Sequence, residues 1–298
     1  MLFTPIIIFS GKGGFVYNKT ISADTTNFNM KSDALANGWD GAVKLTMTVT
    51  VNSGIVVGST STGSYAFDTG ANFPTGSTLT LINNGKILGK GGAGGNGTDI
   101  VGMVLTPTAG ASGGPALNAQ VALTVDNTSG IIGGGGGGGG GAGGYAGSWA
   151  IDCGGYCIDN VDADSPSGGG GQGSTNSSAG TFGNYFNSFY DCGTCTLSAS
   201  AAATSGAQGT AAAAGTAGAG ATWTGDCLGA EGLPSAGAGG SLGSNGGGGG
   251  SGYTYRDNNC TYSSNVNGAS GGAAGACTQG NSNIAWNGHE GTRYGALN

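Results

Sequence analysis

The chain has 298 residues, of which 70 are glycine and only 8% are charged, and its net charge is −7. Nucleic acid or an anionic membrane would require clustered Lys and Arg, so we expect neither as a partner. Four Trp, ten Tyr and nine Phe argue against ordinary disorder, which combines few aromatics with high net charge. The longest apolar run near the start, residues 5–9, is too short for a transmembrane helix or a signal peptide.

Residues 1–130 have the pattern of β structure. Residues 45–51 alternate with period two and are rich in β-branched side chains, and residues 79–82 and 121–125 are similar. The best helix candidate is residues 32–36, which Gly38 ends after barely one turn. We therefore predict a β module over 1–130 with almost no α-helix.

An imperfect repeat runs through this half of the chain. Its three copies are MTVTVNSGIVVG (47–58), TLTLINNGKILG (78–89) and LTVDNTSGIIG (123–133). Each has a strand, an Asn-containing turn closed by glycine and a short apolar segment, which predicts strand–turn–strand units. The second and third copies run directly into glycine-rich sequence.

Residues 131–298 alternate between glycine/alanine tracts and loops rich in aromatic residues. The tracts are 131–148, 167–181, 198–222, 229–251 and 264–276. A single tract of this kind would be a flexible linker, but five at short intervals suggest that they pack together. A polyproline-II helix has three residues per turn and no internal hydrogen bonds, so its backbone groups are free to bond to neighbouring helices when glycine allows close approach.

We therefore predict a polyglycine-II bundle, a glycine-rich bundle of polyproline-II-type helices, over 131–298. Tracts 198–222 and 229–251 are long enough to run up and back, which would gather the large loops at one tip. Loops on a rigid scaffold are where binding residues concentrate.

Two parts of the chain resemble proteins of tailed bacteriophages. ALANGWDGAVKLTMTVTVNSGIVVGSTSTG (34–63) and AFDTGANFPTGSTLTLINNGKILGKGGAGG (66–95) are similar to a module in host-specificity and central-fibre proteins of lambda-like phages. The alternation of glycine tract and aromatic loop resembles the tip adhesins of T-even-like phages. The resemblance implies a polyglycine-II sandwich with receptor-binding loops at its distal tip, attached to the tail through its N-terminal part. It also implies a place in the virion, at the tail tip or fibre, and an extracellular action on the host surface.

The aromatic residues of the loops are the main candidates for receptor binding. Tyr, Trp, Asn and Arg are typical of adaptable binding surfaces, and aromatic faces also suit sugars. The alternative is that these rings cap the end of the bundle, and we expect about half to do each. The candidates are Trp149, Tyr156, Tyr185, Phe186, Phe189, Tyr190, Trp223, Tyr253, Tyr255, Arg256, Tyr262 and Trp286.

The seven cysteines are unexpected for such an adhesin. Cys153, Cys157, Cys192 and Cys195 have a spacing that zinc or disulfides would explain, and we favour disulfides for at least some of them. The remaining three, Cys227, Cys260 and Cys277, leave an odd count. One thiol is therefore free or pairs between subunits.

Other patterns point only weakly to chemistry. Asp159, Asp162 and Asp164 do not make a complete calcium loop, because the glycine at position six and the glutamate at position twelve are missing. SGKGG (10–14) and GKGGAGG (89–95) lack the Ser or Thr that a phosphate loop requires after lysine. We expect no metal, nucleotide or other cofactor.

Catalytic constellations are equally weak. His289 with Glu290, and Asp226 with Glu231, are the available acid/base pairs, and nothing separates them from ordinary loop residues. We expect no enzymatic activity.

The favoured hypothesis is a phage tail-tip adhesin that binds an outer-membrane protein or lipopolysaccharide and attaches to other phage tail proteins, as a homotrimer. The alternative is a structural or ice-binding glycine-rich protein without a receptor. A third hypothesis, a surface-degrading enzyme, would release sugar from isolated envelope.

Overall fold

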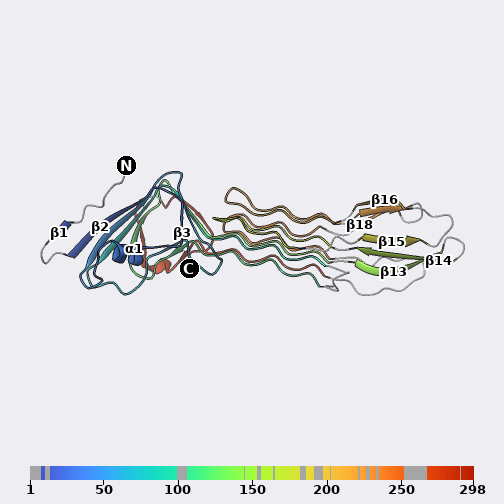
Figure 1. Cartoon of the computed structure of the whole chain (residues 1–298), viewed down its shortest axis with the longest axis horizontal. Coiled ribbons are helices and arrows are strands. Elements are labelled where there is room, and N and C mark those ends of the chain that lie inside the picture. The colour runs from blue at the N-terminus through green and yellow to red at the C-terminus, as the bar shows by residue number, and fades with distance from the viewer. Residues whose placement is uncertain are drawn as a thin grey trace.

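The computed structural model shows an elongated molecule with a β body at one end, a long bundle in the middle and short strands at the other end (Figure 1). The C-terminus lies at the body. In the distal strands and in 8–10 only the backbone is described. The structure describes residues 8–10, 14–98, 106–143, 145–152, 156–163, 165–181, 186–190, 197–201, 203–220, 222–225, 229–232, 235–251, 267–288 and 290–298.

The body consists of three sheets whose strands are parallel, apart from the antiparallel pair β1–β2. The six-stranded sheet has the order β1 (Ile8–Ser10), β2 (Gly14–Ile21), β5 (Leu45–Val51), β8 (Thr78–Asn83), β11 (Leu123–Asp126) and β20 (Ile284–Trp286). The five-stranded sheet has the order β21 (Thr292–Tyr294), β12 (Ile131–Gly133), β9 (Lys86–Leu88), β6 (Val56–Gly58) and β3 (Thr25–Thr26). The four-stranded sheet has the order β19 (Thr278–Gln279), β10 (Leu117–Asn118), β7 (Phe67–Asp68) and β4 (Phe28–Asn29).

The three repeats are successive turns of one coil. In each repeat the long strand belongs to the six-stranded sheet and the short strand after the turn belongs to the five-stranded sheet. The two strands of a repeat therefore do not pair with each other, as they would in a hairpin. They pair in parallel with the same strands of the next repeat, so that Thr48 lies opposite Thr80 and Thr80 opposite Thr124.

A buried ladder of asparagines forms the corner between these two sheets. The Asn83 amide nitrogen donates to Asn127 Oδ1 at 2.7 Å, and Asn127 Nδ2 donates to the Glu290 carbonyl at 3.0 Å. Glycine completes the turn because a Cβ on Gly85 would lie 2.4 Å from the Ile55 carbonyl oxygen of the preceding repeat. The Asn and Gly of the repeats thus stack one repeat on the next.

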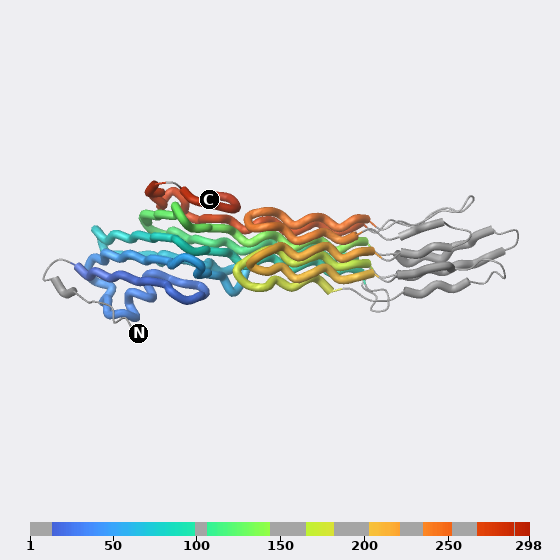
Figure 2. The backbone as a smooth tube through the Cα atoms, turned by 90° about the horizontal axis from the view of Figure 1, so that it is seen from above, coloured from blue at the N-terminus to red at the C-terminus, as the bar shows by residue number. Residues whose placement is uncertain are grey.

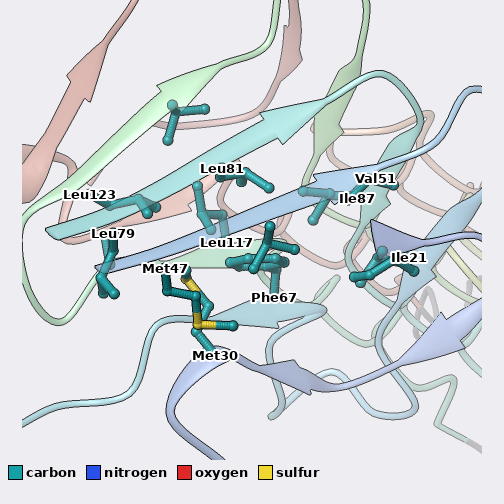
Figure 3. Packing of buried hydrophobic residues seen from close by; sticks show 14 of the residues in the cluster. Ile21, Met30, Met47, Val51, Phe67, Leu79, Leu81, Ile87, Leu117 and Leu123 are labelled. Carbon is teal, nitrogen blue, oxygen red and sulfur yellow. The ribbon is translucent and has the colours of Figure 1, made fainter. Parts of the chain in front are cut away.

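The apolar core lies between the three sheets (Figure 3). The inward positions of β5 follow the predicted alternation, and Leu45, Met47, Val49 and Val51 are all fully buried. Leu81, Ile87, Leu117 and Leu123 add the equivalent positions of later strands. The core therefore repeats along the coil with the same period as the sequence.

The helix α1 (Met30–Ala36) covers one part of this core. Asn29 caps its N-terminus by accepting a hydrogen bond from the Ser32 amide at 2.9 Å, and Gly38 follows its end with φ +98°. Met30 and Ala34 face inward and are fully buried. This helix includes 32–36, which was only the best helix candidate in a sequence without a convincing helix, and it begins two residues earlier. The described chain is mostly β with little helix, as predicted.

Beyond the body the described chain forms extended tracts that run side by side, out and back (Figures 1 and 2). One pair, 89–98 and 106–115, is inserted between β9 and β10. The other tracts lie between β12 and β19, and the chain reverses beside the body near 174–176, 210–213 and 243–244. The reversals at 210–213 and 243–244 confirm that 198–222 and 229–251 run up and back.

Hydrogen bonds between neighbouring tracts repeat every third residue. The amides of Gly135, Gly138 and Gly141 donate to one neighbour, at Gly114, Ala111 and Thr108. The amides of Gly136, Gly139 and Ala142 donate to a second, at Gln172, Gly169 and Pro166, and those of Gly137 and Gly140 to a third, at Ser244 and Gly247. Successive amides of the tract that contains the nine-glycine run thus bond to three different neighbouring tracts in turn.

Close approach of the tracts explains the glycine. A Cβ on Gly138 would lie 1.8 Å from the Ala93 carbonyl oxygen, and one on Gly137 would lie 1.9 Å from that of Gly272. No side chain fits in such a space. Nine consecutive glycines therefore form an interior tract rather than a linker.

The C-terminal residues return to the body. β19, β20 and β21 each lie at an edge of one of the three sheets, and the short 3₁₀ helix Asn281–Asn283 lies between β19 and β20. Leu123 pairs with Ile284, although 161 positions separate them in the sequence. The division into 1–130 and 131–298 stays a prediction about domains, but the β body itself includes 278–294.

Candidate functional site

Six short strands lie at the end of the bundle that is farthest from the body (Figure 1). They form two antiparallel three-stranded sheets. The first consists of β13 (Tyr145–Asp152), β14 (Tyr156–Ala163) and β15 (Phe186–Tyr190), and the second of β16 (Leu197–Ala201), β17 (Thr222–Gly225) and β18 (Gly229–Gly232). Parts of the segments expected to be loops are therefore strands, and they gather at one end as predicted.

The register of the first sheet brings together residues from three separate stretches of sequence. Trp149 lies opposite Asp159, and Asp159 lies opposite Tyr190 on the other side. At the next position of the ladder Asn160 pairs with Phe189, and at the far end of the pairing Ala163 pairs with Phe186. In the second sheet Trp223 lies opposite Glu231.

Of the twelve aromatic and arginine candidates, six are on these strands: Trp149, Tyr156, Phe186, Phe189, Tyr190 and Trp223. Five lie outside the described residues: Tyr185, Tyr253, Tyr255, Arg256 and Tyr262. Their receptor-binding role stays a prediction.

Trp286 is separated from the other candidates, because it lies in β20 of the body. It is partly buried against the body core, and the Arg293 guanidinium lies 4.6 Å from the centre of its ring. Arg293 also forms an ion pair with Glu290. Glu290 therefore has a cationic partner of its own, while His289, the other half of the imagined acid/base pair, lies outside the described residues.

Cys277 is a free thiol in the core of the body. Its Sγ lies 3.2 Å from the Ile132 carbonyl oxygen, to which it donates. Burial raises the pKa of the Cys277 thiol to about 11, and neighbouring Tyr294 and Arg293 oppose this only in part. The pairing or metal binding of the other cysteines stays a prediction, because Cys157 is described only by its backbone and the remaining five lie outside the described residues.

Polar contacts fix the bundle to the body where one reversal meets the five-stranded sheet. The Lys90 ammonium donates to Thr175 Oγ1 and to the Asn176 carbonyl, both at 2.7 Å. Ser174 Oγ accepts from the Ser59 amide and donates to the Ser59 carbonyl, both at 2.9 Å. Lys90, which belongs to the GKGGAGG stretch, thus ties the second repeat to the bundle.

Among the residues with described side chains, no cluster of His, Cys, Asp or Glu is arranged to hold a metal ion. The described helices are also all too short or too polar to cross a bilayer. Neither finding bears on the residues outside the described ranges.

Comparison with known proteins identifies the family. The family model of the phage tail fibre adhesin Gp38 matches residues 16–298, which is nearly the whole chain. A solved structure described as the gp37-gp38 adhesin tip complex of the bacteriophage S16 long tail fiber matches with 20% identity and a TM-score of 0.47. That match covers 94% of this chain and 82% of the other, while no curated protein matches. The chain belongs to the phage tail fibre adhesin Gp38 family.

Proposed function

We propose that the distal sheets form the receptor-binding surface of this adhesin. The observation that carries the proposal is the position of β13–β18 at the end of the bundle farthest from the body. β13, β15 and β17 each carry aromatic residues there, and such residues supply most of the binding energy in many protein interfaces. Binding is non-covalent and changes no bond in the receptor.

The bundle acts as a rigid spacer in this proposal, and we infer that its tracts are polyglycine-II helices. Hydrogen bonds that repeat every third residue support this, because a helix with three residues per turn directs successive amides to three neighbours. Such packing holds the tip residues at fixed positions without an apolar core. Preorganised binding residues lose less entropy when they bind.

The β body is proposed to attach the adhesin to the tail fibre. Its place at the opposite end from the distal sheets supports this role, since it would leave those sheets free to meet the cell. The expected homotrimer stays a prediction, which light scattering of the purified chain would test.

Binding of the labelled chain to intact Gram-negative cells tests the function. The test variant carries Trp149→Ser and Tyr190→Ser, and the matched control carries Trp286→Ser in the body. We expect saturable binding by the parent chain and the control, and a loss of about 1000-fold in the distal variant, since two hot-spot aromatics cost about 2 kcal/mol each and about 1.4 kcal/mol is tenfold.

Circular dichroism and thermal unfolding establish that both variants are folded. Equal loss in the folded control would move the receptor site to the body. A parent chain that binds no strain of a broad panel would contradict the adhesive function proposed for these sheets. An unchanged distal variant would exclude β13 and β15 as the binding surface.

A further inference from the structure

The uncharged bundle separates two groups of charged residues. By sequence, the tracts 91–98, 106–115, 134–143, 165–181, 203–220, 235–251 and 267–277 contain no Asp, Glu, Lys or Arg. The body residues 1–90, 116–133 and 278–298 carry six carboxylates and seven Lys or Arg, which nearly cancel. The five segments that connect the tracts carry nine carboxylates and one arginine. The net negative charge of the protein therefore belongs to its distal segments.

Both distal sheets place a tryptophan in direct register with a carboxylate residue. Asp159 in β14 lies between Trp149 in β13 and Tyr190 in β15, and Glu231 in β18 lies opposite Trp223 in β17. Residues directly opposite each other in an antiparallel ladder share one face of the sheet. Two separate sheets thus repeat one juxtaposition, an acidic residue in register with a tryptophan.

This juxtaposition suits a cationic group. Aromatic rings attract Lys and Arg through their electron-rich faces, Trp most strongly, and a carboxylate adds an ion pair. The strands that carry these residues supply no cation themselves, because residues 91–255 contain no Lys or Arg. Arg256 is the one basic residue in the five connecting segments, against nine carboxylates, so most of their complementary charge has to come from another molecule.

We propose, on the basis of the receptor-binding function proposed above, that the distal sheets bind lysine or arginine side chains on a loop of a bacterial surface protein. Asp159 and Glu231 are the anionic contacts, and Trp149 and Trp223 are their aromatic partners. An anionic glycan is disfavoured, since like charges across an interface cost several kcal/mol unless a divalent cation bridges them.

Substitution of the two carboxylates tests the proposal on intact cells of a strain that the parent chain binds. Asp159→Asn and Glu231→Gln remove charge and keep shape. The matched control is Asp126→Asn in the body. Asp126 Oδ1 accepts a hydrogen bond from the Thr128 amide in a turn, and an asparagine side chain also supports such a turn. We expect about tenfold weaker binding for each distal variant and about 100-fold for the pair, with no change in the control.

Two treatments distinguish the ligand classes. Salt raised from about 0.05 to 0.5 M weakens binding of the parent chain much more than that of the double variant, because salt screens charge pairs. If receptor lysines are bound, acetylation of amines on the cell surface weakens binding. If receptor arginines are bound, modification of surface arginines weakens it instead. These results would support the proposal.

Other results would overturn it while leaving the adhesive function intact. One is parent-like binding of the folded double variant with no dependence on salt. Another is loss of binding in a chelator with no effect of either modification, which would indicate a glycan bridged by divalent cations. Absence of binding by the parent chain would instead overturn the proposed function itself.

Discussion

The body and the bundle satisfy the same backbone requirement in different ways. In the body, parallel strands pair into three sheets and enclose large apolar side chains such as Phe67 and Leu81. In the bundle, the glycine-rich tracts bond to their neighbours through the backbone, and the interior tract 134–143 bonds to three of them. Apart from Cys277 at the junction with the body, the buried hydrophobic residues of the described tracts are Ala142, Ala203 and Ala236. Apolar burial therefore stabilises the body, whereas hydrogen bonding and close backbone packing stabilise the bundle.

The difference shows what each region tolerates. A sheet with an apolar core accepts a smaller side chain at the cost of a cavity. The interior of the bundle has no space for an added atom, since a Cβ there would meet backbone that cannot move aside. We therefore expect added atoms to destabilise the interior of the bundle most, and removed atoms to destabilise the body most.

Gly138→Val gives the largest effect that we predict. Its Cβ would lie 1.8 Å from the Ala93 carbonyl oxygen, so the tracts must separate and lose their mutual hydrogen bonds. We expect a loss of about 5 kcal/mol or more in the free energy of unfolding, which places it among the exceptional substitutions. Chemical denaturation monitored by circular dichroism measures it.

Gly248→Ala is the matched control in an outer tract. The nearest atom to its added Cβ is the Ala269 carbonyl oxygen at 3.7 Å, an ordinary contact. We expect a change within about 0.5 kcal/mol. Equal destabilisation by both substitutions would show that the close approach of backbone at Gly138 is not what requires glycine there.

Leu81→Ala tests the body by the opposite change, removal of atoms. Leu81 is fully buried between the sheets, and we expect a loss of about 3 kcal/mol from burial and cavity terms together. Leu35→Ala, at a side chain that is 45% exposed on α1, is the control and should change stability little. A small effect at Leu81 would mean that apolar packing is not what stabilises the body.

The buried thiol of Cys277 gives the smallest effect and a dependence on pH. Because its pKa is raised from 9.0 to about 11, the folded protein holds this proton while the unfolded chain releases it. The stabilisation is fully present below pH 9 and is lost as the pH rises from 9 to 11, by about 2.7 kcal/mol at most, since one pKa unit corresponds to about 1.36 kcal/mol. Cys277→Ser has an ordinary alcohol there and should remove this part of the pH dependence.

Alkylation measured by mass spectrometry of the peptide that contains Cys277 gives an independent check. At pH 8 the native protein should react far more slowly at this residue than the protein in denaturant, since the thiolate is the reactive form. Equal rates in the two states would contradict the burial of Cys277.

Local sequence predicted those elements whose pattern repeats within a few residues. The strand at 45–51 has the predicted bounds because its alternation places four residues in the core. The helix was only a candidate at 32–36, because the capping role of Asn29 becomes visible in the structure alone. The reversal of the late tracts and the gathering of the intervening segments at one end followed from tract length. The distal strands were missed as strands, since sequences such as YCIDNVDA have no clear alternation.

The candidate site was predicted as a set of residues but not as an arrangement. Composition drew attention to Trp149, Tyr190 and Trp223, yet nothing in it paired Asp159 with two aromatic residues from different stretches. Composition also grouped Trp286 with them, although pairing of β20 with β11 places it in the body. Register between distant segments decides both cases.

The sequence by itself determined the chemistry of the protein: β-branched repeats that need a core, glycine runs that permit close approach, and acidic, aromatic segments between them. These are local properties, because each depends on a residue's own volume, charge or backbone freedom. Only the tertiary structure decided that Leu123 pairs with Ile284, that Gly138 lies between three neighbours, and that Asp159 lies beside Trp149. Those contacts join residues far apart in the chain. Because nearly every residue has the same backbone donor and acceptor, the sequence does not show which backbone groups pair with each other.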